Sequence, residues 1–187
     1  MAESKDNYVI HGMSGKLGNL LVFKQWFGRT IVGKRPRKTD TVTTAQQGIR
    51  DKFQLAAAYA KAAFADTPTK NAYKSKTTPG QTAFNLAISD FFIAPTITDI
   101  DTSGYTGEVG GKIKIAATDD FMVKTVDVVI AKADGSIIEQ GAAVADADGV
   151  HWVYTATLAN AALSGTKITA TAKDLPANMT VKDKILA

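Results

Sequence analysis

The sequence predicts an α+β protein in which an N-terminal β-hairpin and a helical hairpin precede an all-β module. Three patterns support this class. Glycines bracket β-branched and aromatic residues near the N-terminus, an alanine-rich segment repeats its apolar residues every three or four positions, and from Pro95 onward apolar residues alternate with polar ones. The change of period predicts two domains: residues 1–94, a basic hairpin arm with a helical module, and residues 95–187, a β-sandwich.

The first expected element is a β-hairpin, from about Asn19 to Trp26 and from Arg29 to Gly33. Two short apolar runs flank the pair Phe27-Gly28, and a two-residue connection is typical of hairpins. Alternation predicts apolar residues on both faces, with Leu20, Val22 and Trp26 on one and Leu21, Phe23 and Phe27 on the other. Because an isolated hairpin is marginally stable in water, we expect this one to pack on helices or on another subunit.

Helices are expected after a polar linker, KRPRKTDTV. Thr43 to Gln46 offers a capping box, which predicts a helix from about Thr44 to Ala65. Thr67-Pro68 marks a break, and the combination of N-cap, proline and glutamine from Thr78 to Gln81 predicts a further helix start. The apolar stripes consist of Ile49, Phe53, Ala56, Ala60, Ala63 and Phe64, and then Phe84, Ala87, Ile88 and Phe91. We expect two or three helices packed as a hairpin.

The segment after Pro95 contains seven strand-like runs separated by turn signals, of which Asp134-Gly135 is the strongest hairpin signal. The runs are Thr96 to Asp101, Lys112 to Thr118, Met122 to Lys132, Ser136 to Val144, Val150 to Leu158, Lys167 to Lys173 and Met179 to Leu186. Val126, Val128 and Ile130 alternate with polar positions, and Trp152 with Tyr154 supplies a bulky core face. This spacing is typical of an immunoglobulin-like (Ig-like) or fibronectin-like sandwich of seven strands.

Charge is distributed unevenly along the chain. The part before Pro95 has 14 Lys/Arg against 6 Asp/Glu, a net charge of +8, whereas the rest has 8 against 12, a net charge of −4. Between Asp6 and Asp40 there is no acidic residue, so this basic segment predicts an anionic partner. The chain has no cysteine, which excludes disulfides, thiolate nucleophiles and Cys-ligated metals. The first residues lack the pattern of a secretory signal, so we expect synthesis in the bacterial cytoplasm.

Several stretches resemble a known group of proteins. SGKLGN, WFGRTIVGKRP and TTAQQGIRDKF are similar to the N-terminal region of conserved, uncharacterised proteins from Bacteroidetes and their phages. AFNLAISDFFIAPTI, YTGEVGGKIKIAATDD, IIEQGAA and TATAKDLPAN are similar to the sandwich half of the same group and to bacterial Ig-like modules. The resemblance covers nearly the whole chain and implies a component of phage particles; it brings no catalytic residues with it.

The candidate partner-binding residues lie in the basic arm and its aromatic neighbours. They are Lys24, Trp26, Phe27, Arg29, Lys34, Arg35, Arg37 and Lys38. Contact with another protein is the favoured interpretation, because charge runs are unspecific electrostatic footprints. Nucleic acid is the alternative partner, since Lys and Arg release counterions from phosphate and aromatic rings can stack on bases.

Other chemistries find little support in the residues. SGKLGN lacks the Ser/Thr that follows the lysine of a phosphate-binding loop, so its glycines predict tight turns. Asp119, Asp120 and Asp174 at strand ends could converge on Ca²⁺, but turn formation is the simpler interpretation. Only two histidines, His11 and His151, are present. We therefore expect no catalytic residues, no metal and no cofactor.

These observations predict a non-enzymatic structural protein, a capsid, neck or tail-associated component of a phage virion that docks through its basic arm. We expect a homo-oligomer that contacts other particle proteins, with neither a membrane nor a small-molecule substrate as partner. The alternatives are a nucleic-acid-binding protein that uses the same arm and a carbohydrate-binding surface module that uses Trp152.

Overall fold

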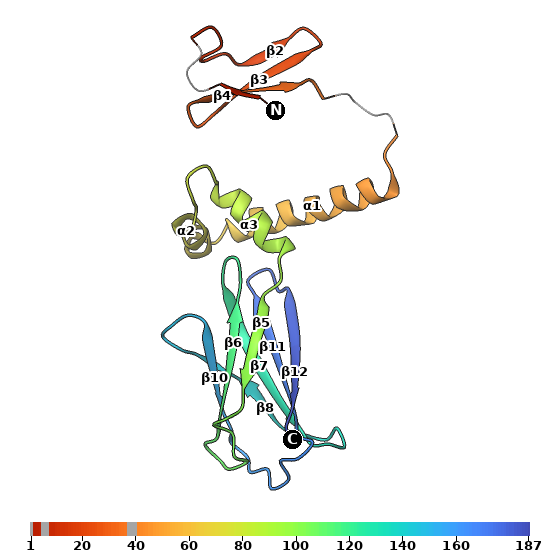
Figure 1. Cartoon of the computed structure of the whole chain (residues 1–187), viewed down its shortest axis with the longest axis vertical. Helices are drawn as coiled ribbons and strands as arrows, with labels where there is room; N and C mark the ends of the chain where they lie inside the picture. The colour runs from red at the N-terminus through yellow and green to blue at the C-terminus, as the bar shows by residue number, and fades with distance from the viewer. Residues whose placement is uncertain (1, 5–7, 37–40) are drawn as a thin grey trace. The chain divides into compact units, whose positions relative to one another are not determined.

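The computed structural model of the chain describes residues 2–4, 8–36 and 41–187 (Figure 1). Within these residues it has three helices and three antiparallel sheets of four strands each, so the expected α+β class is confirmed. The chain divides into two compact units, Met1–Asp51 and Lys52–Ala187. The boundary expected at Ala94 lies inside the second unit, because the helices and the later sheets share packing contacts.

The first unit contains a four-stranded sheet with strand order β1-β4-β3-β2. Its strands are β1 (Ala2–Ser4), β2 (Gly15–Leu17), β3 (Leu21–Trp26) and β4 (Arg29–Lys34). Strands β3 and β4 form the expected hairpin, and their two-residue turn has φ of 47° at Phe27 and 73° at Gly28. Two positive φ values in succession match a type I′ turn, whose twist suits adjacent strands. The flanking strands β1 and β2 were not expected from the sequence.

Three helices follow, and their caps explain where each begins. They are α1 (Thr44–Ala63), α2 (Thr67–Ser75) and α3 (Ala83–Phe92). The capping box of α1 is present: the backbone N–H of Thr43 donates to Gln46 Oε1 (3.1 Å), and that of Gln46 donates to Thr43 Oγ1 (3.3 Å). The start expected at Thr78 is wrong. Gly80 has φ of +96°, which interrupts a helix there, and Thr82 is the N-cap of α3 instead.

The helices pack around buried alanines and aromatic rings. Ala56 and Ala60 of α1 are fully buried, which lets the helices approach closely. Tyr73 of α2 is also fully buried, and its ring stacks on Phe121 with centroids 4.0 Å apart. Since Phe121 belongs to the loop between β6 and β7, this contact joins the helices to the sheets. Figure 1 shows that loop beside the helices, at one end of the sheets.

Two further sheets complete the second unit, with strand orders β5-β6-β10-β9 and β12-β11-β7-β8. The strands are β5 (Thr96–Asp101), β6 (Lys112–Thr118), β7 (Val123–Ala131), β8 (Ile137–Ala142), β9 (Val144–Ala145), β10 (His151–Thr155), β11 (Lys167–Asp174) and β12 (Met179–Ile185). All pairs are antiparallel. The expected run from Ser136 to Val144 divides into β8 and β9, which lie in different sheets.

Both sheets contribute to one apolar core. Ile113 and Ile115 come from the first sheet, whereas Val126, Val128 and Ile130 come from the second, and all five are fully buried. They occupy alternate positions of their strands, as the sequence predicted. Tyr154 is buried in the same core, and Trp152 is half-buried against it. Hereafter residues 95–187 are called the sheet module.

Candidate functional site

Strand register in the first unit brings cations and an aromatic ring to one face of the sheet. Lys24 pairs with Ile31, Trp26 with Arg29, and Lys16 with Val22. Directly paired residues of antiparallel strands share a face, and so do residues two positions apart. Lys16, Lys24, Trp26 and Arg29 therefore lie together on one side. We call these four residues the cationic face.

Every side chain of the cationic face is exposed. Neither Lys16 nor Lys24 takes part in an ion pair formed among the described residues. No acidic side chain of the described residues therefore neutralises these lysines, and both can bind an anionic partner. The sequence predicted Lys24, Trp26 and Arg29 as partner-binding residues but not Lys16, whose place on this face depends on the unexpected strand β2.

The remaining predicted residues of the arm lie elsewhere. Lys34 pairs with Leu21 and so points to the opposite face of the sheet. Arg35 is exposed, and its Nη1 donates to Asn19 Oδ1, a neutral acceptor. Arg37 and Lys38 lie outside the described residues. The structure therefore gathers only part of the expected basic arm into one surface.

An exposed aromatic pair forms the tip of the hairpin. Trp26 is 56% exposed and Phe27 is 69% exposed, and their ring centroids are 6.2 Å apart. Phe27 lies in the turn, so the expectation that it shares a strand face with Leu21 and Phe23 is wrong. Its φ of 47° is uncommon for a bulky residue. A strained, exposed aromatic residue is typical of functional sites, since local stability alone would favour Asn or Gly here.

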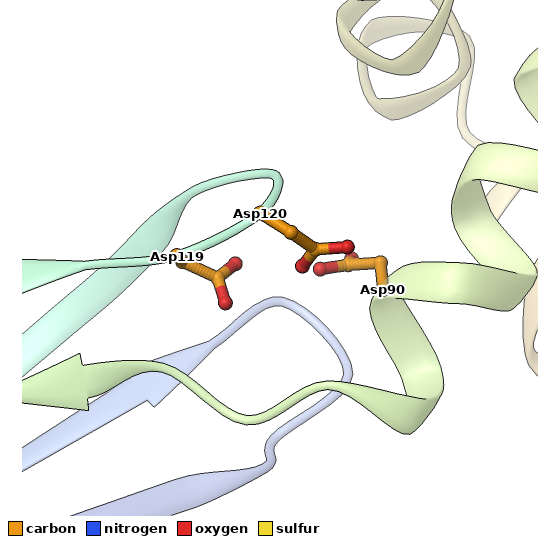
Figure 2. A group of neighbouring side chains, drawn as sticks. All are labelled: Asp90, Asp119 and Asp120. Atoms are coloured by element: carbon orange, nitrogen blue, oxygen red, sulfur yellow. The ribbon is translucent and has the colours of Figure 1, made fainter.

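A second group of charged side chains lies in the second unit, where α3 meets the loop between β6 and β7. Asp90 of α3 and Asp119 and Asp120 of the loop each offer a carboxylate oxygen, and these oxygens lie within 4.8 Å of one another (Figure 2). We call these three residues the acidic cluster. The sequence named Asp119 and Asp120 as weak calcium candidates together with Asp174, but the structure brings Asp90 into the group instead.

The third predicted aspartate serves a local structural role. Asp174 Oδ1 accepts from the backbone N–H of Asn178 (2.7 Å), and Asp174 Oδ2 accepts from Asn178 Nδ2 (2.8 Å). This is the turn-forming role that the sequence predicted for it. Burial raises the pKa of Asp174, although the hydrogen bonds from Asn178 lower it.

Burial dominates the electrostatics of the acidic cluster. It raises the pKa of Asp90 to about 7, and the neighbouring carboxylates of Asp119, Asp120 and Asp174 add to the rise, whereas a hydrogen bond from Tyr73 opposes it. Burial and the carboxylate of Asp119 also raise the pKa of Asp120. The hydroxyl groups of Tyr73 and Tyr59 are 2.9 Å apart, so a chain of hydrogen bonds leads from Tyr59 to Asp90.

The other candidate sites have structural explanations. Gly15 and Gly18 have φ of 106° and 55°, in agreement with glycines that permit turns. His151 Nδ1 lies 2.5 Å from Asp148 Oδ2 in the turn before β10, where Asp148 also accepts the backbone N–H groups of Val150 and His151. No helix among the described residues is long and apolar enough to cross a membrane.

No family model and no curated protein matches the chain. A solved structure, the crystal structure of an engineered protein, aligns with a TM-score of 0.37 and 12% identity over 60% of this chain. The aligned region spans 30% of that structure's length. The likeness is too low to carry an argument about fold or function.

Proposed function

We propose that the protein is a non-enzymatic assembly component that docks through its cationic face and the aromatic tip of the hairpin. The observation that supports this is the convergence of Lys16, Lys24, Trp26 and Arg29 on one exposed face beside Phe27. Aromatic residues and arginine are enriched in protein interfaces, and exposed lysines around them steer an acidic partner toward the correct orientation.

The basic and the aromatic residues are expected to contribute different free energies to docking. An exposed ion pair contributes only about 0.2–1 kcal/mol. A tryptophan that loses roughly 100 Å² of exposed apolar surface contributes about 2.5 kcal/mol. Docking strength is therefore expected to come from Trp26 and Phe27, whereas the cations set the association rate and the choice of partner.

The sheet module is proposed to be an Ig-like sandwich. Strand order supports this assignment. If β5, β6, β7, β8, β9, β10, β11 and β12 correspond to strands A, B, C, C′, D, E, F and G, the sheets read ABED and GFCC′, an arrangement typical of Ig-like domains. The module would act as a non-catalytic body that carries the docking unit or packs against neighbours.

The working location is proposed to be a phage virion, and the working state a homo-oligomer. The resemblance of the N-terminal and sandwich segments to phage proteins supports the location. The excess of basic residues in the first unit and of acidic residues in the sheet module supports contact between copies, in which the cationic face of one meets the sheet module of the next. Imaging of purified particles at moderate resolution would locate the chain.

Nucleic acid is the second candidate partner, because Trp26 is flanked on its face by Lys24 and Arg29. An aromatic ring between cations suits single-stranded nucleic acid, whose bases stack while the phosphates are neutralised. Fluorescence anisotropy with a labelled oligonucleotide separates the two candidates. Binding that weakens steeply with salt and is lost in Lys24→Glu supports nucleic acid, whereas a flat isotherm at low salt removes this candidate.

Sedimentation of the full chain tests the main proposal. We expect concentration-dependent oligomers in the wild type and at least roughly tenfold weaker association in Trp26→Ala, because the lost burial exceeds 1.4 kcal/mol. Leu17→Ala removes an exposed apolar side chain from the opposite face of the same sheet, where Leu17 pairs with Leu21, and is the matched control, with association unchanged. A wild type that stays monomeric at high concentration, together with no retention on purified particles, would contradict the proposal.

A further inference from the structure

We propose that the acidic cluster binds a divalent cation, and that Ca²⁺ is the ion it suits best. Asp90, Asp119 and Asp120 would supply carboxylate oxygens, and water would complete the coordination. This inference does not depend on the proposed function, because the cluster and the cationic face belong to different compact units.

The geometry places three hard oxygen ligands around one point. Figure 2 shows the carboxylates of Asp90 and Asp120 facing each other across the space between α3 and the loop, with Asp119 beside them. Their ligand oxygens are within 4.8 Å of one another, as expected for atoms that share an ion at 2.3–2.6 Å. Asp120 is exposed and Asp119 is half-buried, so two of the three ligand residues are in contact with solvent.

Unsatisfied buried oxygens are the second observation that points to a ligand. Asp90 is fully buried, and its Oδ2 accepts a hydrogen bond from Tyr73. Asp90 Oδ1 is buried without a hydrogen-bond partner among the described residues, and so is Asp119 Oδ1. Asp119 Oδ2, in contrast, accepts from the backbone N–H groups of Phe121 (3.3 Å) and Met122 (3.0 Å). Unsatisfied buried carboxylate oxygens are costly, and a cation would satisfy both.

Within the described part of the chain, no cation is paired with the carboxylates of the cluster. None of the ion pairs formed among the described residues includes Asp90, Asp119 or Asp120. Lys76 instead donates from its Nζ to the Phe121 carbonyl oxygen, and this nitrogen lies 5.0 Å from the centroid of the Phe121 ring. Three clustered carboxylates therefore need either a bound cation or a proton on one of them.

The ligand set favours Ca²⁺ over the alternatives. Zn²⁺, Cu²⁺ and Ni²⁺ prefer imidazole or thiolate ligands, whereas the cluster offers carboxylates alone, which suit Ca²⁺, Mg²⁺ and Mn²⁺. Mg²⁺ demands near-ideal octahedral geometry and is usually bound by one or two carboxylates, whereas Ca²⁺ accepts irregular geometry and several carboxylates. With three protein carboxylates from two segments, we expect a modest affinity, with Kd of about 10⁻⁵–10⁻³ M. The bound ion would fasten α3 to the sheet module.

Calorimetric titration of the full chain with CaCl₂ and with MgCl₂ tests the proposal directly. We expect one Ca²⁺ per chain with weaker Mg²⁺ binding, and a melting temperature about 5–10 °C higher at a Ca²⁺ concentration of about 100 times Kd than in chelator. Terbium provides a local probe, since Tyr73 donates to Asp90 and would sensitise the emission of an ion bound there. Added Ca²⁺ should quench that emission by displacement.

Variants decide whether the ion lies at the cluster. Asp120→Asn changes an exposed side chain, so folding should be preserved, and Ca²⁺ affinity should fall at least roughly tenfold. Asp99→Asn alters an exposed aspartate of β5 and should bind as the wild type does. The proposal is overturned if the wild type shows neither binding heat nor a Ca²⁺-dependent melting temperature, as expected if Asp90 holds a proton instead. Equal affinity in Asp120→Asn and the wild type would also overturn it.

Discussion

Gly107 lies in the loop between β5 and β6, where a side chain has neither a suitable backbone conformation nor space. Its φ is +82°, and a Cβ atom would lie 2.4 Å from the backbone oxygen of Asn160 and 3.0 Å from Leu163 Cδ2. Asn160 and Leu163 belong to the loop before β11, so two loops meet at this glycine. Backbone cannot move aside as a flexible side chain can.

We expect Gly107→Ala to lower the free energy of unfolding by about 3 kcal/mol, because strain and a backbone clash add together. Gly110→Ala is the matched control. Gly110 also has a positive φ, +91°, but a Cβ atom there meets nothing within 4 Å, so the cost should be only about 1 kcal/mol. Urea unfolding followed by circular dichroism measures both. Equal losses in the two variants would show that the clash is relieved by loop movement.

Glu139 of β8 is a buried carboxylate that ties its strand to the segment after β10. Its Oε2 accepts from Thr157 N (2.8 Å), Thr157 Oγ1 (2.7 Å) and Leu158 N (3.2 Å). Burial raises the pKa of Glu139, but these hydrogen bonds and one from Tyr154 outweigh burial, and the net pKa is lower than usual. The hydrogen bonds thus favour the charged form in the folded protein.

Because the pKa of Glu139 is lowered in the folded state, its contribution to the free energy of unfolding depends on pH in a defined direction. The stabilisation that it contributes is complete above the usual glutamate pKa and is lost as the pH falls through the lower pKa of the folded state. Glu139→Gln should lower the free energy of unfolding by about 1–2 kcal/mol at neutral pH, with a smaller difference from the wild type in acid. Denaturation across a pH series measures this. A difference that grows in acid would contradict the assignment, and exposed Glu108→Gln is the control.

At the scale of elements, the C-terminal end of α3 is capped by a side chain that lies far away in the sequence. Asn178 Nδ2, in the turn between β11 and β12, lies 3.2–3.3 Å from the backbone oxygens of Asp90, Phe91 and Ile93 and 2.8 Å from Asp174 Oδ2. An amide has two hydrogens, so these contacts share them. The last carbonyl groups of a helix otherwise lack partners, and this amide supplies donors to them.

Asn178→Ala should therefore destabilise the protein by about 2–3 kcal/mol, since several acceptors lose their donor together. Asn178→Asp should cost at least as much, because it places a carboxylate against carbonyl oxygens and beside Asp174. The control is Asn85→Ala, a substitution of an exposed side chain on α3 that should have little effect. Thermal unfolding compares the three. A melting temperature that Asn178→Ala leaves unchanged would mean that water replaces the amide.

Elements encoded locally could be predicted from the sequence, whereas long-range pairings could not. The hairpin turn at Phe27-Gly28 and the capping box of α1 each depend on residues within four positions of one another, and both are confirmed. Strands β1 and β2 are three residues long and depend on partners elsewhere in the chain, so periodicity gave no sign of them.

The acidic cluster could also be predicted only in part, because it depends on a contact between residues far apart in the sequence. Asp119 and Asp120 stood out because they follow a strand, but Asp90 lies in the middle of an apolar helical stripe and about thirty positions earlier. A signal did exist: an aspartate within AFNLAISDFF is unusual, because a buried acid requires a hydrogen-bond donor or a cation. Which loop would face it could be known only from the folded structure.

For the whole molecule, the net charge changes sign most strongly at the start of the sheet module, and less strongly at the boundary between the two compact units. Residues 1–51 carry nine Lys/Arg against four Asp/Glu, a net charge of +5, and residues 52–187 carry 13 against 14, a net charge of −1. Within the second unit the helical segment is basic, and the sheet module retains its net charge of −4. A copy could therefore present a basic first unit to the acidic sheet module of another copy, a head-to-tail contact that builds rings or filaments.

Such contact has a definite dependence on salt. Screening shortens the Debye length from about 10 Å at 0.1 M salt to about 3 Å at 1 M, so the oligomers seen by sedimentation at low salt should associate more weakly as NaCl is added. Lys24→Glu should weaken association at low salt, whereas Lys132→Glu, an exposed reversal in the turn between β7 and β8, should not. Association that strengthens with salt would contradict a role for the charged residues and would leave burial of Trp26 and Phe27 as the sole driving force, since salts that are excluded from protein surfaces favour apolar contact.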